Sequence, residues 1–270
     1  MFWHNVRLLN ATAALLVVCA VLLLLGAAAW RVAHLPMFTL RELEVQPAPG
    51  VALRHVNAAT IRANINGRFT GNFFTANLDS VRTAFESVPW VRRASVRRSW
   101  SDGLQVQIEE HTVMGTWGGG ESPKLVNLQG EVFVANIDEA EADLAPGARL
   151  IALRGPEGSS KEMVSVLKDV GGWFAPLGWK PVELVLSPRY AWTVRFDGGT
   201  RVELGRDLSE QDRATIAARA ARFVRSWPLA RSRLANKELD YADLRYTNGF
   251  AVRQGKPRVG ERNDESVDGT

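Results

Sequence analysis

One long apolar stretch near the N-terminus restricts the fold more than any other feature of this sequence. Residues 11–30 read ATAALLVVCAVLLLLGAAAW, 20 residues without a charged side chain, and a helix needs about 20 such residues to cross the core of a membrane. A cleaved signal peptide is the alternative, because GAAAW resembles a cleavage site. The apolar run is longer than the roughly 7–15 residues of a typical signal-peptide core, which favours an uncleaved anchor.

This anchor predicts the location of the rest of the chain. We expect a short cytoplasmic tail over residues 1–7, a transmembrane helix over 8–30 and a linker over 31–37. Positive charges lie on both sides of the helix, so charge bias predicts little about orientation. A tail this short is more easily left in the cytoplasm. We therefore expect a single-pass inner-membrane protein with most of its chain in the periplasm.

Cysteine and charge content exclude several function classes. The chain has one cysteine, Cys19, inside the apolar stretch, so the exported part has no disulfide, cysteine metal site or thiol nucleophile. The net charge is +4, with 29 acidic residues spread among the basic ones. Nucleic-acid binding requires a concentrated basic face, and none is evident.

Residues 38–111 predict a small α+β domain. Alternating apolar residues indicate strands, and apolar residues at helical spacing indicate helices. The expected order is strand, helix, helix, strand, strand, over residues 38–46, 56–65, 77–88, 90–100 and 104–110. Asn57 and Asn77 are expected to cap the two helices, and Pro89 to end the second.

Residues 112–255 predict a second, β-rich domain, with an extended antiparallel sheet and flanking helices. Gln129-Gly130 marks one hairpin turn, and Asp197-Gly198-Gly199 marks another. A helix over 161–174 is expected to be capped by Ser159 or Ser160, and a long helix over 208–227 to stop at Pro228. The acidic run 138–143 is expected to be a solvated loop. The polar residues 256–270 are expected to be disordered.

No catalytic arrangement emerges from the sequence. The four histidines are scattered, and none has metal-ligand spacing. Glu109 and Glu110 end a strand and are expected to be solvated, with their side chains on opposite faces. The segment GFAVRQGKP has Pro257 where a phosphate-binding loop needs Ser or Thr. We therefore expect no enzyme activity, no catalytic or metal residues and no cofactor.

Two arginine pairs form the sharpest charge feature. In residues 90–100, the expected strand places Ala94 and Val96 toward the core and Arg93 and Arg97 outward. These arginines form either an ordinary solvated strand face or a docking surface for acidic partners or anionic lipid headgroups.

The segment DLRYTNGFAVR, residues 243–253, predicts a terminal hairpin. Asn-Gly between two alternating runs is a strong signal for a two-residue turn. The strand 239–247 would direct Leu244 into the core and expose Tyr241 and Arg245. The last strand would then lie on a sheet edge, which is an aggregation hazard unless a partner uses it. Lys256-Pro257 would end that edge.

Several of these segments, in this order, resemble the bacterial FtsQ/DivIB cell-division family. They include VPWVRRASVRRSW, LVNLQGEVF and LDYADLRYTNGFAVR. The resemblance implies a polypeptide-transport-associated (POTRA) domain over 38–111 and a β domain over 112–255. It also implies a non-enzymatic scaffold at the division septum, which links early and late division proteins. The implied partners are FtsB and FtsL and, through them, the septal peptidoglycan synthase FtsW–FtsI.

The resemblance also assigns a binding surface for FtsB. The partner would add a strand to the last sheet edge. The implied contact residues are Arg189, Tyr241, Arg245, Tyr246, Asn248, Gly249, Phe250, Ala251, Val252 and Arg253. Arg189 is expected on the neighbouring strand or as an ordinary surface arginine, and Tyr246 either in the core or in direct contact. An outer-membrane assembly or secretion component is the alternative function, although such proteins usually carry tandem POTRA copies.

Overall fold

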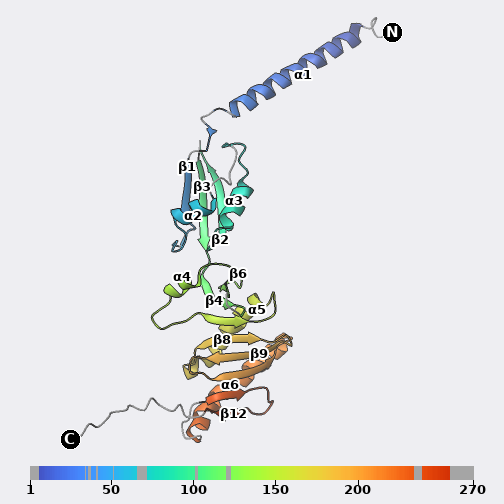
Figure 1. The fold of residues 1–270 in the computed structure, drawn as a ribbon. Coiled ribbons are helices and arrows are strands. Elements are labelled where there is room, and N and C mark those ends of the chain that lie inside the picture. The colour runs from blue at the N-terminus through green and yellow to red at the C-terminus, as the bar shows by residue number, and fades with distance from the viewer. Residues whose placement is uncertain are drawn as a thin grey trace, which may run out of the picture. The chain divides into compact units, whose positions relative to one another are not determined.

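The computed structural model describes residues 6–33, 35, 38–40, 42–50, 52–65, 72–100, 103–119, 123–233 and 239–255. The chain forms two compact units that divide between His111 and Thr112 (Figure 1). The expected tail over 256–270, including Lys256-Pro257, lies outside the described residues.

The first element, α1 (Val6–Ala33), is the apolar helix. It extends beyond the expected 8–30 at both ends. Its window Asn10–Ala33 is long and apolar enough to cross a membrane, and none of it is buried by the protein. It is the one helix of this kind in the described part of the chain. A single-pass membrane anchor therefore fits this structure.

The rest of the first unit has the expected strand–helix–helix–strand–strand order. Its elements are β1 (Glu42–Pro47), α2 (Ala58–Ile65), α3 (Leu78–Glu86), β2 (Val91–Ser99) and β3 (Gly103–Glu110). The three strands form a sheet in the order β1-β3-β2, with β1 parallel and β2 antiparallel to β3. The Asn77 side chain accepts hydrogen bonds from the amides of Asp79 and Ser80, so the predicted cap of α3 is confirmed.

Glu110 differs from its expected role as a solvated charge. Its side chain is buried, and its carboxylate accepts the backbone amides of Arg54, His55 and Val56 at 2.9, 3.1 and 2.6 Å. Glu109 also has a partner, Arg92, at 2.6 Å. Glu110 therefore secures the loop before α2. A buried carboxylate is tolerated there because backbone donors satisfy it.

The second unit is a nine-stranded sheet with helices. Its elements are β4 (Val113–Trp117), β5 (Lys124–Asn127), β6 (Val132–Phe133), α4 (Ile137–Ala142), β7 (Ile151–Arg154), α5 (Ser160–Phe174), the 3-10 helix η2 (Ala175–Leu177), β8 (Pro181–Leu186), β9 (Ala191–Phe196), β10 (Arg201–Arg206), α6 (Glu210–Arg233), β11 (Leu239–Asp243) and β12 (Ala251–Gln254). The strand order is β12-β11-β10-β9-β8-β7-β4-β5-β6.

The sheet is mixed, which corrects the expected antiparallel sheet. Three neighbouring pairs are parallel: β4 with β7, β7 with β8, and β10 with β11. Parallel neighbours require a crossover connection. The helix α5 makes the crossover between β7 and β8, and α6 makes the one between β10 and β11. The α+β class is confirmed.

Both crossover helices cover the same apolar face of the sheet (Figure 1). Val170 and Phe174 of α5 and Phe223 of α6 join one buried cluster with strand residues such as Val194 and Val202. These five side chains are at most 1% exposed. The other face of the sheet remains polar, and its contacts belong to the site described below.

Three local expectations about helices were wrong. The acidic run 138–143 mostly forms α4, because Asn136 caps its first turn and Ala140 is buried. Pro228 lies inside α6, which continues to Arg233. Ser159 is the N-cap of α5 by position but makes no side-chain cap bond. Ser160 instead donates to the carbonyl oxygen of Gly130 at 2.7 Å.

Candidate partner-binding edge

The last strand, β12, ends the sheet order next to β11. This confirms that the C-terminal strand lies at an edge. Within the described residues, no strand pairs with its other side. The side chains alternate across the edge: Val252 packs against the core cluster, whereas Ala251 and Arg253 are exposed. An incoming strand would therefore meet a partly apolar and partly charged border.

The hydrogen-bond directions in β11 determine which groups of β12 point outward. The amide of Leu244 donates to the carbonyl oxygen of Glu203 at 2.9 Å, so the even-numbered residues of this segment direct their backbone groups toward β10. Tyr241 and Asp243 then direct theirs toward β12, where they face Arg253 and Ala251. Backbone polar groups alternate sides along a strand. The N–H and C=O of Val252 therefore point away from β11.

The connection between β11 and β12 is not the expected two-residue turn. Asp243 pairs with Ala251, so residues 244–250 form the loop, and Asn248-Gly249 lies within it. The strand β11 ends at Asp243 and does not reach Thr247. The expected alternation also fails there, because Ala242, Asp243 and Leu244 are all buried.

Contacts with α6 hold this loop in place. The rings of Phe250 and Phe223 lie 4.9 Å apart, edge to face. The Arg222 guanidinium donates to the carbonyl oxygen of Thr247. Leu244 is 1% exposed, as predicted from its place in the strand. The loop is thus anchored at both ends, and Tyr246 between them is 56% exposed, which rules out core packing for that side chain.

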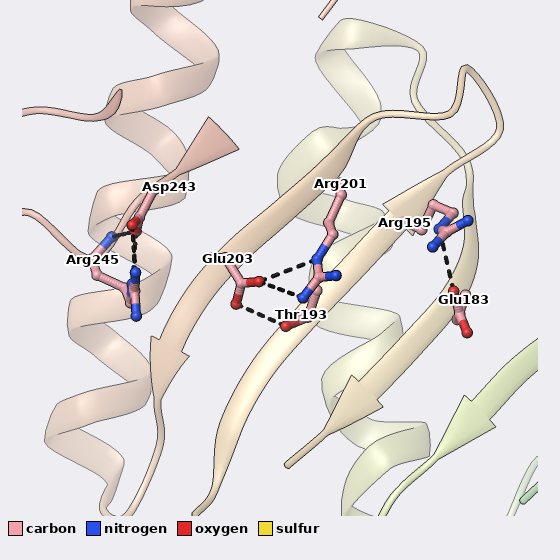
Figure 2. Close-up of polar contacts among 7 residues, drawn as sticks. All are labelled: Glu183, Thr193, Arg195, Arg201, Glu203, Asp243 and Arg245. Carbon is pink, nitrogen blue, oxygen red and sulfur yellow. Dashed lines mark hydrogen bonds and ion pairs between the residues drawn. The ribbon is translucent and has the colours of Figure 1, made fainter. Parts of the chain in front are cut away.

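A clamp between Asp243 and Arg245 terminates β11 (Figure 2). The guanidinium donates through Nε to Oδ1 at 2.9 Å and through Nη2 to Oδ2 at 2.6 Å, and the Arg245 amide also donates to Oδ1 at 3.0 Å. The carboxylate is buried, whereas the arginine side chain is 59% exposed. These hydrogen bonds lower the pKa of Asp243 despite its burial, and the same carboxylate raises the pKa of Arg245.

Gly205 provides the surface on which Arg245 rests. Its φ is +103°, and a Cβ there would lie 3.5 Å from Cγ of Arg245. The pairing of β9 and β10 shifts register between Glu203 and Gly205, which marks a bulge. Glycine accommodates the positive φ without strain. The bulge in β10 therefore lies against the clamp that ends β11, the strand next to β12.

The polar face of the sheet carries a row of charges toward the edge. The Arg201 guanidinium contacts Glu203 at 2.8 Å, and the Thr193 hydroxyl donates to the same carboxylate at 2.8 Å (Figure 2). Glu183 on the next strand contacts Arg195 at 3.3 Å. These groups are paired with one another. The face is therefore charged, and the charges largely compensate each other.

Tyr241 and Arg253 complete this row at the edge. Arg201, Tyr241 and Arg253 are register partners on β10, β11 and β12. The Arg253 guanidinium lies 5.2 Å from the centre of the Tyr241 ring and 2.9 Å from a carboxylate oxygen of Asp240. Burial and the Asp243 carboxylate raise the pKa of Tyr241, so its hydroxyl stays protonated at neutral pH.

Arg189, another predicted site residue, lies apart from this row. Arg189 is exposed in the turn between β8 and β9, not on the strand next to β11. The Asp207 amide donates to the Tyr190 carbonyl oxygen at 3.2 Å, so this turn lies at the end of the sheet where β10 ends. Sequence reasoning missed Asp240 and Asp243. Only the register of β11 and β12 brings Asp240 to Arg253. Asp243 lies two residues from Arg245, and this spacing is too common to have indicated the clamp.

The other predicted surface lies in the first unit. Arg93 and Arg97 are exposed on β2, an edge strand of the three-stranded sheet. Arg97 donates to Oε1 of Gln107 at 2.9 Å. Nearby, the Glu86 carboxylate accepts the Ala94 amide at 3.2 Å and so covers part of that edge. No group of three or more His, Cys, Asp or Glu in the described parts of the chain could hold a metal ion.

Comparisons with known proteins identify both units. Residues 115–245 match the family described as "Cell division protein FtsQ/DivIB, C-terminal", and residues 50–111 match "POTRA domain, FtsQ-type". A protein named "Cell division protein FtsQ" from Burkholderia pseudomallei is 45% identical over 93% of this chain and 94% of its own length. The chain belongs to the FtsQ/DivIB family of cell division proteins.

Two further FtsQ proteins support this membership. The one from Bordetella pertussis is 41% identical over 93% of this chain and 92% of its own, and the one from Nitrosospira multiformis is 37% identical over 93% and 98%. The FtsQ/DivIB match ends at Arg245, so it includes the Asp243–Arg245 clamp and stops before β12. The predicted family and POTRA domain are thus confirmed.

Proposed function

We propose that this protein is a non-enzymatic scaffold of the divisome, anchored by α1 in the inner membrane with both folded units in the periplasm. Its task is to recruit FtsB and FtsL at the septum and, through them, the septal peptidoglycan synthase FtsW–FtsI. Family membership supports a role in cell division. The recruiting surface is the outer edge of β12.

One observation carries this proposal: Val252 directs a backbone donor and acceptor away from β11. An extended segment can pair with such groups by strand addition, and side-chain pockets then provide specificity. The edge is also rigidly supported, because Phe250 packs against Phe223 behind it. A rigid edge lowers the ordering cost of binding.

The flanking side chains suggest how the partner strand is selected. Ala251 and Arg253 lie on the polar face, next to Tyr241 and the exposed side of Arg245. Tyr246, Asn248 and Gly249 extend this surface along the loop, and Arg189 lies at the same end of the sheet. We expect an FtsB segment with acidic and aromatic residues to complement these groups.

The test compares two substitutions at one position. Val252→Pro removes the outward N–H, and proline is tolerated on an edge strand whose N–H faces solvent. Val252→Ala is the control, because it removes two methyl groups and retains the N–H. We expect co-purification of the full chain with a periplasmic FtsB segment to survive Val252→Ala and to fail with Val252→Pro.

Equal binding by the two variants would contradict strand addition at this edge. Truncation after Thr247 is a less specific test, because it also removes the Phe250 contact with α6. Thermal unfolding of both variants provides the control, since similar transitions show that the β11–β12 pairing is retained.

We propose Arg93 and Arg97 as a second docking surface, for an acidic partner. Both are exposed on the edge strand β2. Repeating the co-purification over a range of salt concentrations tests this electrostatic contribution, because screening weakens contacts between exposed charges. An outer-membrane assembly or secretion role is the second candidate. The FtsQ-type POTRA match and the FtsQ relatives favour the divisome.

A further inference from the structure

Four aromatic residues form a cluster at one end of the first unit. Phe38, Phe73, Phe74 and Trp100 contact one another with ring centres 4.8–6.5 Å apart. Phe38 and Phe73 are buried, at 8% and 7% exposure, whereas Phe74 is 47% and Trp100 is 77% exposed. The buried rings of Phe38 and Phe73 therefore support the exposed rings of Phe74 and Trp100 at the surface.

This aromatic cluster lies next to the end of α1. Phe38 follows Ala33, the last residue of α1, by five positions, which limits their separation to about 17 Å. The Asn72 side chain also donates to the Ala33 carbonyl oxygen at 2.6 Å, and the Phe73 amide donates to the Phe38 carbonyl oxygen at 2.8 Å. The covalent and hydrogen-bonded connections both place the aromatic cluster close to where the helix ends.

The length of α1 brings its end to the membrane surface. The helix has 28 residues, or about 42 Å at 1.5 Å per residue. A bilayer is about 40–45 Å thick with its headgroups, of which about 30 Å is hydrocarbon. The last turn, with the exposed Trp30, therefore lies in the headgroup region. Tryptophan is enriched at that depth because its ring is apolar and its N–H is polar.

Exposed apolar side chains are concentrated at this end of the unit. Among the described residues from Leu35 to His111, the exposed large apolar side chains are Leu35, Leu43, Phe74 and Trp100. Leu43 pairs with Leu104 at the start of β3, beside the strand end that leads to Trp100. A patch of this kind marks a site that contacts a membrane or another protein. The opposite end of β3 carries none that the structure describes.

We propose that the aromatic cluster inserts Phe74 and Trp100 into the headgroup layer of the membrane that α1 spans. Continuity with the span identifies the occupant as the bilayer, because the patch begins within a few residues of the helix end. Arg98 is exposed and stabilises the turn that carries Phe74. Its guanidinium donates to the carbonyl oxygens of Phe73 and Ala76 at 2.6 and 2.9 Å. Insertion of the two rings would hold the first unit to the membrane at a second point, in addition to α1.

Insertion of aromatic rings and attraction between surface charges respond differently to salt. The acidic Glu42 begins β1 at the same end, beside Gly103, so this end is not a purely basic surface. Apolar contacts are insensitive to ionic strength, whereas contacts between exposed charges weaken with salt. The proposed contact should therefore persist at high salt.

A spin-label experiment on the full chain tests the proposal. Cys19 is the one cysteine of the chain, so a Cys19→Ser background allows a single label. Ser99→Cys places it beside Trp100. Ala52→Cys is also exposed and lies two residues before Arg54, whose amide binds Glu110 at the other end of β3. The strand β3 is about 24 Å long at 3.4 Å per residue. Both proteins are reconstituted in nanodiscs of phosphatidylethanolamine and phosphatidylglycerol.

The readout is the ratio of label accessibility to oxygen, which dissolves in lipid, and to a water-soluble nickel chelate. We expect a severalfold higher ratio for Ser99→Cys than for Ala52→Cys, at low and at high salt. Adding Phe74→Ser and Trp100→Ser should lower the Ser99→Cys ratio to that of Ala52→Cys. An unchanged Ala52→Cys spectrum shows that the domain remains folded.

Three outcomes would overturn the proposal. Equal ratios for the two labels in the intact chain would place the aromatic cluster in water. A high ratio that disappears at high salt would indicate that charges, and not inserted aromatic rings, hold the domain at the membrane. A ratio that survives the double substitution would show that Phe74 and Trp100 do not hold the domain at the surface.

Discussion

At the scale of single residues, the pair Asp243 and Arg245 links the stability of the second unit to its proposed binding edge. Asp243 is 5% exposed, and its carboxylate receives three hydrogen bonds, two of them from the guanidinium. Charged, bidentate bonds of this type are stronger than neutral ones. The clamp ends β11 and directs the chain into the loop that carries Tyr246.

Arg245→Ala should therefore destabilise the protein at neutral pH. It leaves a buried carboxylate with the backbone donor alone, which costs about 1–3 kcal/mol. Arg253→Ala is the matched control. Its ion pair with Asp240 is exposed, with the two side chains at 70% and 48%, and such pairs contribute about 0.2–1 kcal/mol. Urea unfolding of the full chain in detergent measures both.

The Arg245→Ala effect should also depend on pH. Because Arg245 lowers the pKa of Asp243 in the folded state, its stabilisation is present above the unfolded value of about 3.9 and is lost as pH falls through the lower folded value. The difference between wild type and variant should shrink below about pH 4. A difference that stays constant down to strongly acidic pH would contradict this role of the clamp.

At the scale of elements, the junction of β4 and β7 depends on one glycine. Gly115 pairs with Ile151, and a Cβ at Gly115 would overlap the carbonyl oxygen of Ile151. A backbone atom cannot move aside as a flexible side chain can. This close approach allows β4 and β7 to pair in parallel, and so it joins β4, β5 and β6 to the other six strands of the sheet.

Gly115→Ala should separate these strands. Overpacking of this kind costs about 1–3 kcal/mol or more. Gly171→Ala is the control, because a Cβ there meets nothing within 4 Å. That substitution in the interior of α5 should stabilise the protein by about 0.5–1 kcal/mol. Urea unfolding midpoints that shift in the same direction for the two variants would contradict the argument.

At the scale of the whole molecule, the two units have separate cores. Phe85 of α3 is 0% exposed in the first unit, while Phe223 belongs to the core cluster of the second. Each unit can therefore lose stability by itself. The proposed binding edge and the proposed membrane contact lie in different units.

Phe85→Ala should reveal this independence. Removing a buried phenylalanine costs about 3–5 kcal/mol, and we expect the loss to be confined to the first unit. Amide hydrogen exchange measured by mass spectrometry should show faster exchange in β2 and β3 and unchanged exchange in β8–β10. Faster exchange in β8–β10 as well would show that the two units unfold together.

Much of the architecture follows from the sequence, and particular residues show where prediction fails. The spacing of apolar residues indicated α3, α5 and most of α6, and it placed Leu244 in the core. It misplaced the end of α6, because Pro228 is accommodated within the helix. It also predicted a tight Asn-Gly turn where contacts with Phe223 and Arg222 hold a longer loop.

The sequence by itself determined the apolar helix, the order of elements in the first unit and the family, because these depend on local composition, periodicity and motif order. Only the tertiary structure decided that the sheet is mixed, that Glu110 and Asp243 are buried with partners, and that Val252 directs its backbone groups outward. These features depend on strand register and on contacts between residues far apart in the chain. Local spacing does not specify such contacts, since burial and hydrogen bonding are properties of the folded arrangement.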